Sequence, residues 1–323
     1  MTTSASVDFS LTRDNIITMA LQLTGVVEEG GTASANQITD AARFLNALCK
    51  EFMTKGLQLW TTEEIVVFPI LDTVTLRLGG SSTDRMTKSD DFIHTTISAD
   101  EAASQTTLSV TSSTGMATSD KVGIVMDSGG IHWTTISSIP DSTSIIIASA
   151  ITGAASSGNR VYTYTTTFGS ASQLPKRVLE AWTQSADSIS RDVDVISRNE
   201  YSSLANKISE GYIYQVFFDP QLTESLLSVW QRPGDNNMDQ VLYLYIQRII
   251  EDFDATGDTP DFPQEWYLAL VYNLAMSCAV VWGCTQERFN RIASLAKFYL
   301  DEASNFDIET TSIYLQPKYN PTN

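Results

Sequence analysis

The sequence is poor in histidine, cysteine and basic residues. It has 2 His and 3 Cys in 323 residues, and 38 Asp and Glu stand against 20 Lys and Arg, which gives a formal net charge of −18. Two histidines far apart in the sequence, His94 and His132, argue against a His-rich metal site. The shortage of cations argues against a surface that grips nucleic acid, because neutralising phosphates requires Lys and Arg.

The three cysteines do not form a CxxC motif, and an odd number cannot all be paired in disulfides. We expect Cys49, Cys278 and Cys284 to be small buried thiols, since nothing in the sequence near the last two would activate them. The N-terminus has neither a basic nor an apolar signal region. The most apolar stretch, 266–282, is interrupted by polar residues and falls short of the roughly 20 residues of a spanning helix. These features predict a soluble protein without a targeting signal.

Residues 11–56 are predicted to form a helical hairpin. The first helix, 13–24, has a threonine before it and a glycine after it, which suit its two caps. The second helix opens with a capping box formed by Ser34 and Gln37. It is expected to end at Gly56, and its apolar face recurs at helical spacing through Ile38, Ala41, Leu45, Leu48 and Phe52.

The next part of the chain has strand patterns. Residues 64–70 and 73–78 are rich in Val, Ile and Thr. Within 92–173, Ser and Thr fill more than a third of the positions, and apolar runs alternate with turn signals at 127–130 and at Pro140. This pattern indicates a small all-β module. Its predicted strands are 107–111, 121–126, 131–139, 144–148 and 160–166.

The last part of the chain mixes strands and helices. Ser197 and Glu200 form a capping box at the start of a short helix. Pro263 suits the first position of a helix that runs to Trp282, and a final helix follows from about Thr285. Residues 310–323 have the pattern of an extended tail. The predicted strands here are 178–185, 192–196, 212–218, 225–230 and 241–250.

Together these patterns predict an α+β fold with a discontinuous domain. Residues 1–90 and 174–307 would form a helical bundle with a small antiparallel sheet. Residues 91–173 would be an inserted all-β module, sandwich-like or barrel-like, and 308–323 an extended C-terminal tail. Insertion of a module at a loop is tolerated because the termini of a domain usually lie close together.

Motifs for catalysis or cofactor binding are missing. There is no phosphate-binding loop, no GxSxG and no HExxH. Carboxylates occur as neighbours at 63–64, 90–91 and 251–254, and a glycosidase needs such a pair. Because pairs arise by chance in so acidic a chain, we expect solvated surface, with hydrolysis of glycosides or peptidoglycan and cation binding as alternatives. The stretch EDFDATGD at 251–258 lacks the spacing of an EF-hand. We therefore expect no catalytic, cofactor-binding or metal-binding residues.

Two further features have more than one reading. His132 lies beside Trp133 in a predicted strand, where a cross-strand structural contact is favoured over a role in a catalytic triad. Aromatic residues are abundant in the predicted sheet of the last part, and core packing, a subunit interface or a stacking platform would each use them. They are Tyr212, Tyr214, Phe217, Phe218, Trp230, Tyr243 and Tyr245.

Three segments resemble one family. The opening TRDNIITMALQLTGVVEEGGTASANQITDAARFLNALCKEFMTKGLQLW resembles the N-terminal helical hairpin of head-to-tail adaptors (head completion or tail tubular connector proteins) of short-tailed bacteriophages. The segment RDVDVISRNEYSSLANKISEGYIYQVFFDP is similar to their short helix with paired strands. The segment IEDFDATGDTPDFPQEWYLALVYNLA, followed by WGC, is similar to their Pro-started helix and the helix after it. The inserted module departs from the minimal adaptor.

This resemblance implies a structural virion protein and not an enzyme. Such proteins form a homo-oligomeric ring, usually dodecameric, between the portal protein and the tail nozzle or tube. The ring is assembled in the host cytoplasm and resides at the head–tail junction of the virion. Double-stranded DNA passes through its centre without specific binding, and neither a cofactor nor a membrane is involved. The C-terminal tail would reach the portal through Ile313, Tyr314, Leu315 and Tyr319.

Two alternatives belong to other classes of protein. The β module could serve a receptor-binding or glycan-binding component of the tail. Less in keeping with the sequence, the carboxylate pairs could serve a peptidoglycan hydrolase. An excess of carboxylates fits the adaptor, because an acidic lumen repels the phosphates of DNA and lets the duplex slide.

Overall fold

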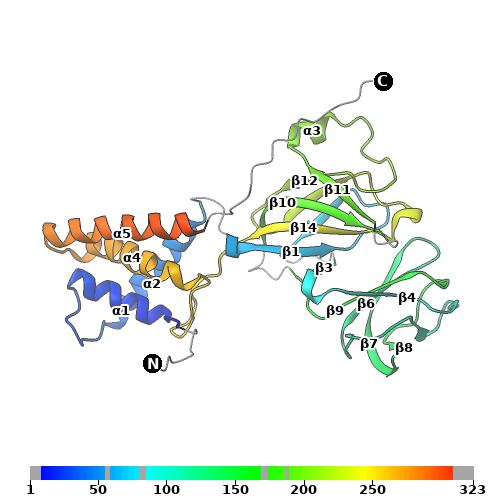
Figure 1. Cartoon of the computed structure of the whole chain (residues 1–323), viewed down its shortest axis with the longest axis horizontal. Helices are drawn as coiled ribbons and strands as arrows, with labels where there is room; N and C mark the ends of the chain where they lie inside the picture. Colours follow the sequence, from blue (N-terminus) through cyan, green and yellow to red (C-terminus); the bar gives the residue numbers. More distant parts are fainter. Residues whose placement is uncertain (1–8, 55–58, 80–84, 169–173, 186–188, 308–323) are drawn as a thin grey trace, which may run out of the picture. The chain divides into compact units, whose positions relative to one another are not determined.

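The protein has a mixed α+β fold, drawn in Figure 1. The computed structural model describes residues 9–54, 59–79, 85–168, 174–185 and 189–307. Its contacts divide the chain into two compact units, Met1–Thr61 with Ile250–Asn323, and Thr62–Ile249.

These dividing points differ from the boundaries near 90 and 174 expected from the sequence. The strands at 62–67 and 241–248 belong to the same unit as the Ser/Thr-rich segment. The reason is hydrogen bonding. The strand at 62–67 pairs along its whole length with the strand at 241–248, and the latter also pairs with the strand at 175–184, so all three belong to one sheet.

The first unit is built from four long helices. The central one, α4 (Tyr267–Trp282), packs against α1 (Arg13–Thr24), α2 (Ala35–Phe52) and α5 (Gln286–Phe306). The N-terminal hairpin and the C-terminal helix pair therefore fold together, as the sequence patterns predicted. Two short 3-10 turns, η1 (Leu59–Thr61) and η5 (Gln264–Trp266), precede β1 and α4 in the chain.

The predicted helix ends are largely confirmed. The Thr12 hydroxyl accepts a hydrogen bond from the Asn15 N–H, and Gly25 follows α1 with a φ of 80°. Ser34 and Gln37 form the complete capping box of α2. α2 ends at Phe52, earlier than expected, and Gly56 lies outside the described residues.

The apolar stretch identified in the sequence is the core helix of this unit. Residues Gln264–Trp282 form 19 residues of helix, which by length and composition alone could cross a membrane, and more than half of this helix is buried inside the protein. Asn273, which interrupts the stretch, is itself buried. Its Nδ2 donates to the carbonyl oxygens of Ala269 at 2.8 Å and of Ala296 at 3.2 Å, so it ties α4 to α5.

The second unit contains an eight-stranded sheet that curls into a nearly closed barrel. Its order is β2-β13-β12-β11-β10-β14-β1-β3. The strands are β1 (Thr62–Val67), β2 (Thr75–Leu78), β3 (Met86–Lys88), β10 (Pro175–Gln184), β11 (Ser190–Val195), β12 (Gln215–Asp219), β13 (Ser225–Trp230) and β14 (Val241–Arg248).

The expectation of a small, purely antiparallel sheet is corrected by this topology. β11 and β12 run parallel, whereas the other neighbouring strands are antiparallel. A parallel pair needs a crossover connection. Here α3 (Arg198–Ser203), capped by Ser197 and Glu200 as predicted, lies in that connection. Side chains alternate along the strands, and one face encloses a core that includes Ile65, Leu76, Val216, Leu227 and Leu244.

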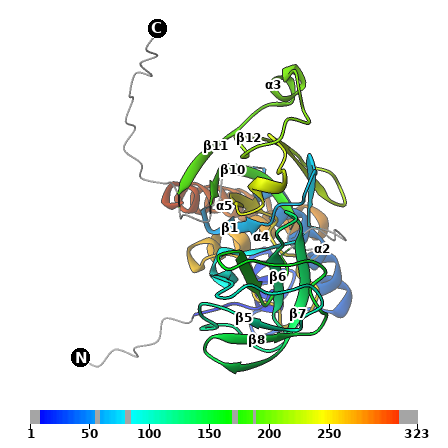
Figure 2. The same cartoon turned by 90° about the vertical axis from the view of Figure 1, so that its right-hand side faces the viewer.

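A six-stranded antiparallel half-barrel occupies the Ser/Thr-rich segment (Figure 2). Its order is β4-β9-β6-β7-β8-β5, and an isolated bridge between Ile97 and Val110 links the chain after β4 to the chain after β5. Pro140 lies within β7, at an irregularity of the β7–β8 ladder, and not in a turn as expected. The strands are β4 (Ile93–Thr96), β5 (Thr107–Ser109), β6 (Lys121–Val125), β7 (Ile131–Asp141), β8 (Ser144–Ile147) and β9 (Arg160–Tyr164).

An aromatic cluster connects the two sheets. Phe68, which follows β1, contacts the rings of Trp133, Tyr162 and Tyr164 from the half-barrel, with ring centroids 4.9 to 5.5 Å apart. Phe68, Tyr162 and Tyr164 are almost completely buried. The half-barrel is therefore packed onto the larger sheet through shared core residues.

Candidate functional site

The two histidines lie at separate places in the half-barrel. His94 on β4 stacks on Phe92, with ring centroids 5.7 Å apart, and burial together with nearby Arg160 lowers the pKa of the imidazole. His132 on β7 contacts Ser149, whose Oγ lies 3.4 Å from the imidazole Nε2. The sequence favoured a contact between strands, whereas Ser149 lies beyond the end of β8.

The cysteines are free thiols. Cys49 and Cys278 are buried, and Cys284 is half-buried. Burial raises the pKa of Cys49 to about 12 and that of Cys278 to about 11. Both thiols therefore stay protonated at neutral pH and are poor nucleophiles.

The carboxylate pair on β1 does not have the geometry of a hydrolase. Glu63 and Glu64 are consecutive in a strand, so their side chains point to opposite faces of the sheet. Glu63 accepts hydrogen bonds from Lys88 and Arg248, each at 3.0 Å. A glycosidase instead requires two carboxyl groups that face one substrate across a gap.

The pair at 90–91 lies in the short turn η2 (Ser89–Asp91). Asp90 is exposed, whereas Asp91 accepts hydrogen bonds from the backbone N–H groups of Thr165 and Thr166 and from the Thr87 hydroxyl. Asp91 therefore fixes the end of β9 against β3.

The acidic segment that follows β14 forms a loop in the helical unit and surrounds a hollow of about 520 Å³. The Asp258 carboxylate accepts hydrogen bonds from the N–H groups of Ala255 and Asp254, and these bonds lower its pKa. The Asp261 carboxylate accepts from the Glu251 N–H at 3.2 Å. Across the described residues, no group of three or more His, Cys, Asp or Glu is arranged to hold a metal ion. These two carboxylates instead shape the loop.

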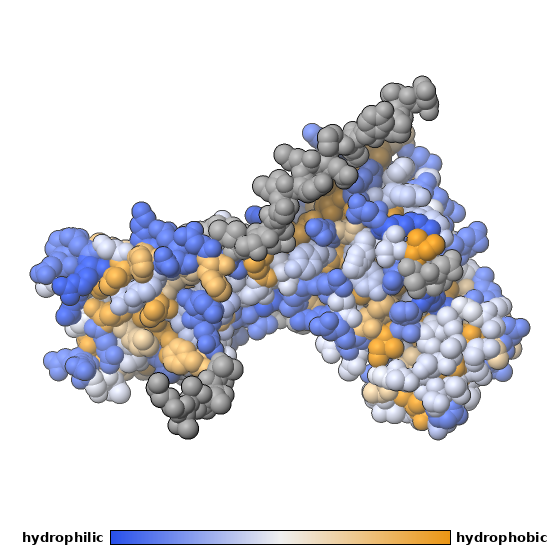
Figure 3. Space-filling model, viewed as in Figure 1, coloured by the Kyte–Doolittle hydropathy of each residue, from blue (hydrophilic) through white to orange (hydrophobic). Residues whose placement is uncertain are grey.

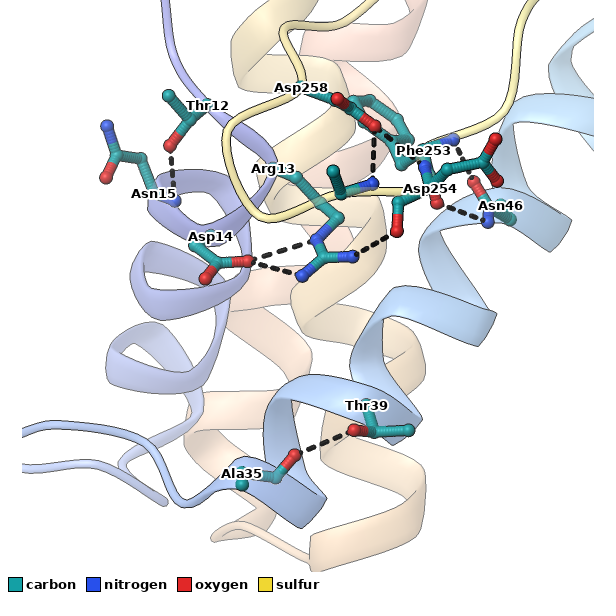
Figure 4. Close-up of polar contacts among 11 residues, drawn as sticks. Thr12, Arg13, Asp14, Asn15, Ala35, Thr39, Asn46, Phe253, Asp254 and Asp258 are labelled. Carbon is teal, nitrogen blue, oxygen red and sulfur yellow. Dashed lines mark hydrogen bonds and ion pairs between the residues drawn. The ribbon is translucent and has the colours of Figure 1, made fainter.

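Two helices hold this acidic loop in place, as Figure 4 shows. Asn46 on α2 uses both ends of its amide, because its Nδ2 donates to the Phe253 carbonyl at 3.2 Å and its Oδ1 accepts from the Phe253 N–H at 2.9 Å. At the start of α1, the Arg13 N–H donates to the Asp258 carbonyl at 2.8 Å. The Arg13 guanidinium reaches Asp14 and the Asp254 carbonyl. These contacts therefore hold the N-terminal helices α1 and α2 against the segment that leads into α4.

The helical unit exposes an apolar groove. It has a volume of about 300 Å³, with α1 forming one side and α4 the other. Tyr272 of α4 also stacks on Tyr299 of α5, with ring centroids 5.0 Å apart. Figure 3 shows apolar side chains gathered over these helices on the face turned to the viewer. The groove is lined by Met19, Gln22, Leu23, Leu268, Val271 and Tyr272.

A second apolar surface lies at the other end of α4. The side chains of Val280 and Val281 are 73% and 53% exposed. Next to them, the ring of Trp282 packs edge-on against Phe44 of α2, with centroids 6.5 Å apart. We call the pair Val280 and Val281 the valine ridge. The sequence placed these residues on a helix, but it could not show which of them the neighbouring helices leave uncovered.

The aromatic residues of the larger sheet do not form one surface. Tyr243 contacts Trp182, with centroids 4.6 Å apart, and Phe218 packs against the barrel core. Phe217 is covered by Tyr201 of α3 at 5.6 Å. Tyr214 and Tyr245 are exposed. The other members of the set are half-buried, so none of the seven lies fully inside the core.

The four tail residues proposed to contact a portal, Ile313, Tyr314, Leu315 and Tyr319, lie outside the described residues. In comparisons with known proteins, no family model and no curated protein sequence matches this chain.

Proposed function

We propose that this protein is a structural head-to-tail adaptor of a short-tailed bacteriophage, without enzymatic activity. It would form a homo-oligomeric ring between the portal protein and the tail nozzle or tube. The proposal rests on the resemblance of three segments of the sequence, and one structural observation supports it. The N-terminal hairpin and the C-terminal helix pair pack into one helical unit, in which Arg13 also contacts Asp254, 241 residues further along the chain.

Specific contacts maintain this association of the two chain ends. Arg288 at the start of α5 donates from Nη1 to the carbonyl oxygen of Thr24 at 3.1 Å, and so caps the C-terminal end of α1. Lys50 on α2 donates to the Ile250 carbonyl and pairs with Asp252, both at 2.7 Å. A helical unit held together by these contacts is suited to forming interfaces with neighbouring subunits of a ring.

The charge of the chain also suits a conduit for DNA. If the carboxylates behind the net charge of −18 face the channel, they would repel phosphate, and a duplex in the ring would slide without being held. We also propose that the chain is a helical bundle with a small sheet and an inserted β module. The half-barrel would then be an addition to the minimal adaptor, displayed outward or in contact with a neighbouring subunit.

The direct test mixes the purified protein with portal rings and examines the product by electron microscopy. We expect rings of this protein bound in a fixed ratio to the portal. If instead the protein is found in native particles only at the tail tip, or binds glycans and not the portal, a receptor-binding role replaces the proposal. Zymogram activity that is lost in Glu64→Gln or Glu251→Gln would favour the hydrolase.

The predicted tail contact has its own test. Replacing Ile313, Tyr314, Leu315 and Tyr319 with serine should weaken portal binding about tenfold or more, because one lost apolar anchor already costs about 1–2 kcal/mol. The matched control replaces Asn320 and Asn323 with serine and should bind normally. Equal binding by both variants in a sedimentation assay would show that the tail does not make this contact.

A further inference from the structure

We propose that the outer face of the larger sheet, where β1, β14 and β10 lie side by side, binds an arginine-containing segment of a partner protein. The aromatic side chains of this face are Trp182, Tyr243 and Tyr245, and the carboxylates beside them belong to Glu64 and Glu180. We call these five residues the acidic aromatic face. The inference goes beyond the adaptor function and does not depend on it, because the face lies within the β unit.

The register of the strands places the five side chains on one side of the sheet. Residues directly opposite each other in antiparallel strands point to the same side. Tyr245 on β14 lies opposite Glu180 on β10 and opposite Glu64 on β1, and Tyr243 lies opposite Trp182. The alternate residues of β14 belong to the barrel core. The acidic aromatic face is therefore the outer face of these strands.

The aromatic rings of this face are accessible and held in position. Tyr245 is 41% exposed, and its hydroxyl lies 2.8 Å from Oγ1 of Thr62. Tyr243 and Trp182 are half-buried, with ring centroids 4.6 Å apart, and the Tyr243 hydroxyl donates to Oε1 of Gln184 at 3.3 Å. Rings that are fixed before binding lose little side-chain entropy when a ligand stacks on them.

The two carboxylates of this face make no ion pair within the described part of the chain. Glu180 is exposed and Glu64 is half-buried. Glu63, on the opposite side of β1, instead pairs with Lys88 and Arg248, each at 3.0 Å. The charges of Glu64 and Glu180 flank Tyr245 from both neighbouring strands, so a cation placed over this ring would lie between two carboxylates.

This combination of rings and carboxylates fits a guanidinium group. A guanidinium is planar and stacks on aromatic rings, while its N–H groups pair with carboxylates. The same sheet already holds one arginine in this way, because the Arg198 guanidinium lies 5.1 Å over the ring of Phe217 and pairs with Asp219 at 2.7 Å. A neutral sugar would stack on the rings but leave both carboxylates without a counter-charge. Charge complementarity therefore favours a basic segment as the occupant.

The experiment measures binding of a fluorescently labelled peptide of alternating arginine and glycine to the full chain by fluorescence anisotropy. The comparison peptide carries citrulline in place of each arginine, which keeps the shape and removes the charge. We expect the arginine peptide to bind and the citrulline peptide to bind about tenfold more weakly or less, because charged hydrogen bonds to the carboxylates are lost. This comparison uses the unaltered protein, so it needs no variant to fold.

Variants locate the binding on the acidic aromatic face. Glu64→Gln combined with Glu180→Gln should weaken binding of the arginine peptide about tenfold. The matched control, Asp301→Asn with Glu302→Gln, removes two charges from exposed positions of α5 and should bind as the wild type does. Tyr245→Ala should weaken binding about threefold, whereas Tyr245→Phe keeps the ring and should bind normally.

Circular dichroism and the unfolding midpoint of each variant should match the wild type. The inference is overturned if the arginine peptide does not bind, or if the citrulline peptide binds equally well. Equal binding by the two double variants would also overturn it, because the contact would then reflect the net charge of the chain and not this face. Binding of cellohexaose that is lost in Tyr245→Ala, without binding of the arginine peptide, would identify a glycan as the occupant. None of these outcomes bears on ring formation with the portal, so the adaptor function is tested separately.

Discussion

At the scale of single residues, two observations show that position 129 requires glycine. It lies in the turn between β6 and β7 and has a φ of +85°. A Cβ added there would lie 2.6 Å from the Cα of Asp235, in the short helix η4 (Asp235–Asn237) that precedes β14. The turn of the half-barrel therefore lies against η4 at a distance that only glycine permits.

Gly129→Ala should destabilise the β unit by roughly 1–3 kcal/mol, from backbone strain together with the contact to Asp235. The measurement is the free energy of unfolding in urea. Gly130→Ala is the matched control, since Gly130 is the next residue in the same turn and a Cβ there meets nothing within 4 Å. Equal stability of the two variants would contradict the close packing of the turn.

At the scale of elements, the acidic loop depends on a few polar contacts from α1 and α2. Asn46 alone satisfies both the N–H and the carbonyl of Phe253. Phe253 is itself buried, so the side chain and the backbone of this residue are both held. The loop is the connection through which the chain returns from β14 to α4.

Asn46→Ala should cost about 1–3 kcal/mol of stability, because it leaves two backbone groups of Phe253 without their partner. Amide hydrogen exchange at 250–258 should accelerate in this variant. Asn36→Ala, at an exposed position near the start of the same helix, should change neither quantity. Unchanged exchange in Asn46→Ala would mean that the loop is held by its other contacts.

At the scale of the whole molecule, the path of the chain makes the β unit separable. The chain enters this unit at β1 and leaves it after β14, and these strands are antiparallel neighbours with Thr62 opposite Gln247. The ends of the segment 62–249 therefore lie side by side. Its cores are formed from residues of the segment itself.

The segment 62–249 expressed alone should fold as a stable, cooperative unit. We expect a β-rich circular dichroism spectrum, dispersed amide resonances and a single unfolding transition. As a comparison, the segment 91–173 should be markedly less stable alone, because it lacks Phe68, Met238 and Val241 and exposes the aromatic cluster that they cover. If 91–173 is as stable alone as 62–249, the shared core contributes little.

Much of the local structure could be predicted from the sequence. The capping boxes at Ser34 and Ser197 act between residues three apart, so the physics that forms them is local. The half-barrel strands β5 to β9 were predicted within a few residues, because turn signals and β-branched runs mark them directly. The short strands β3 and β4 were missed, since three or four residues carry too little pattern and form strands only by pairing with β1 and β9.

The sequence by itself determined the helix caps, the strand-forming runs, the deficit of cations and the apolar character of α4, because these depend on neighbouring residues or on composition. Only the tertiary structure decided the parallel pairing of β11 with β12 and the division of the chain at 62 and 249. It alone decided which side chains of α4 stay uncovered, leaving Leu268 and Val280 exposed while Asn273 is buried. These outcomes depend on contacts between residues far apart in the chain, and local pattern carries no information about which distant partner is met.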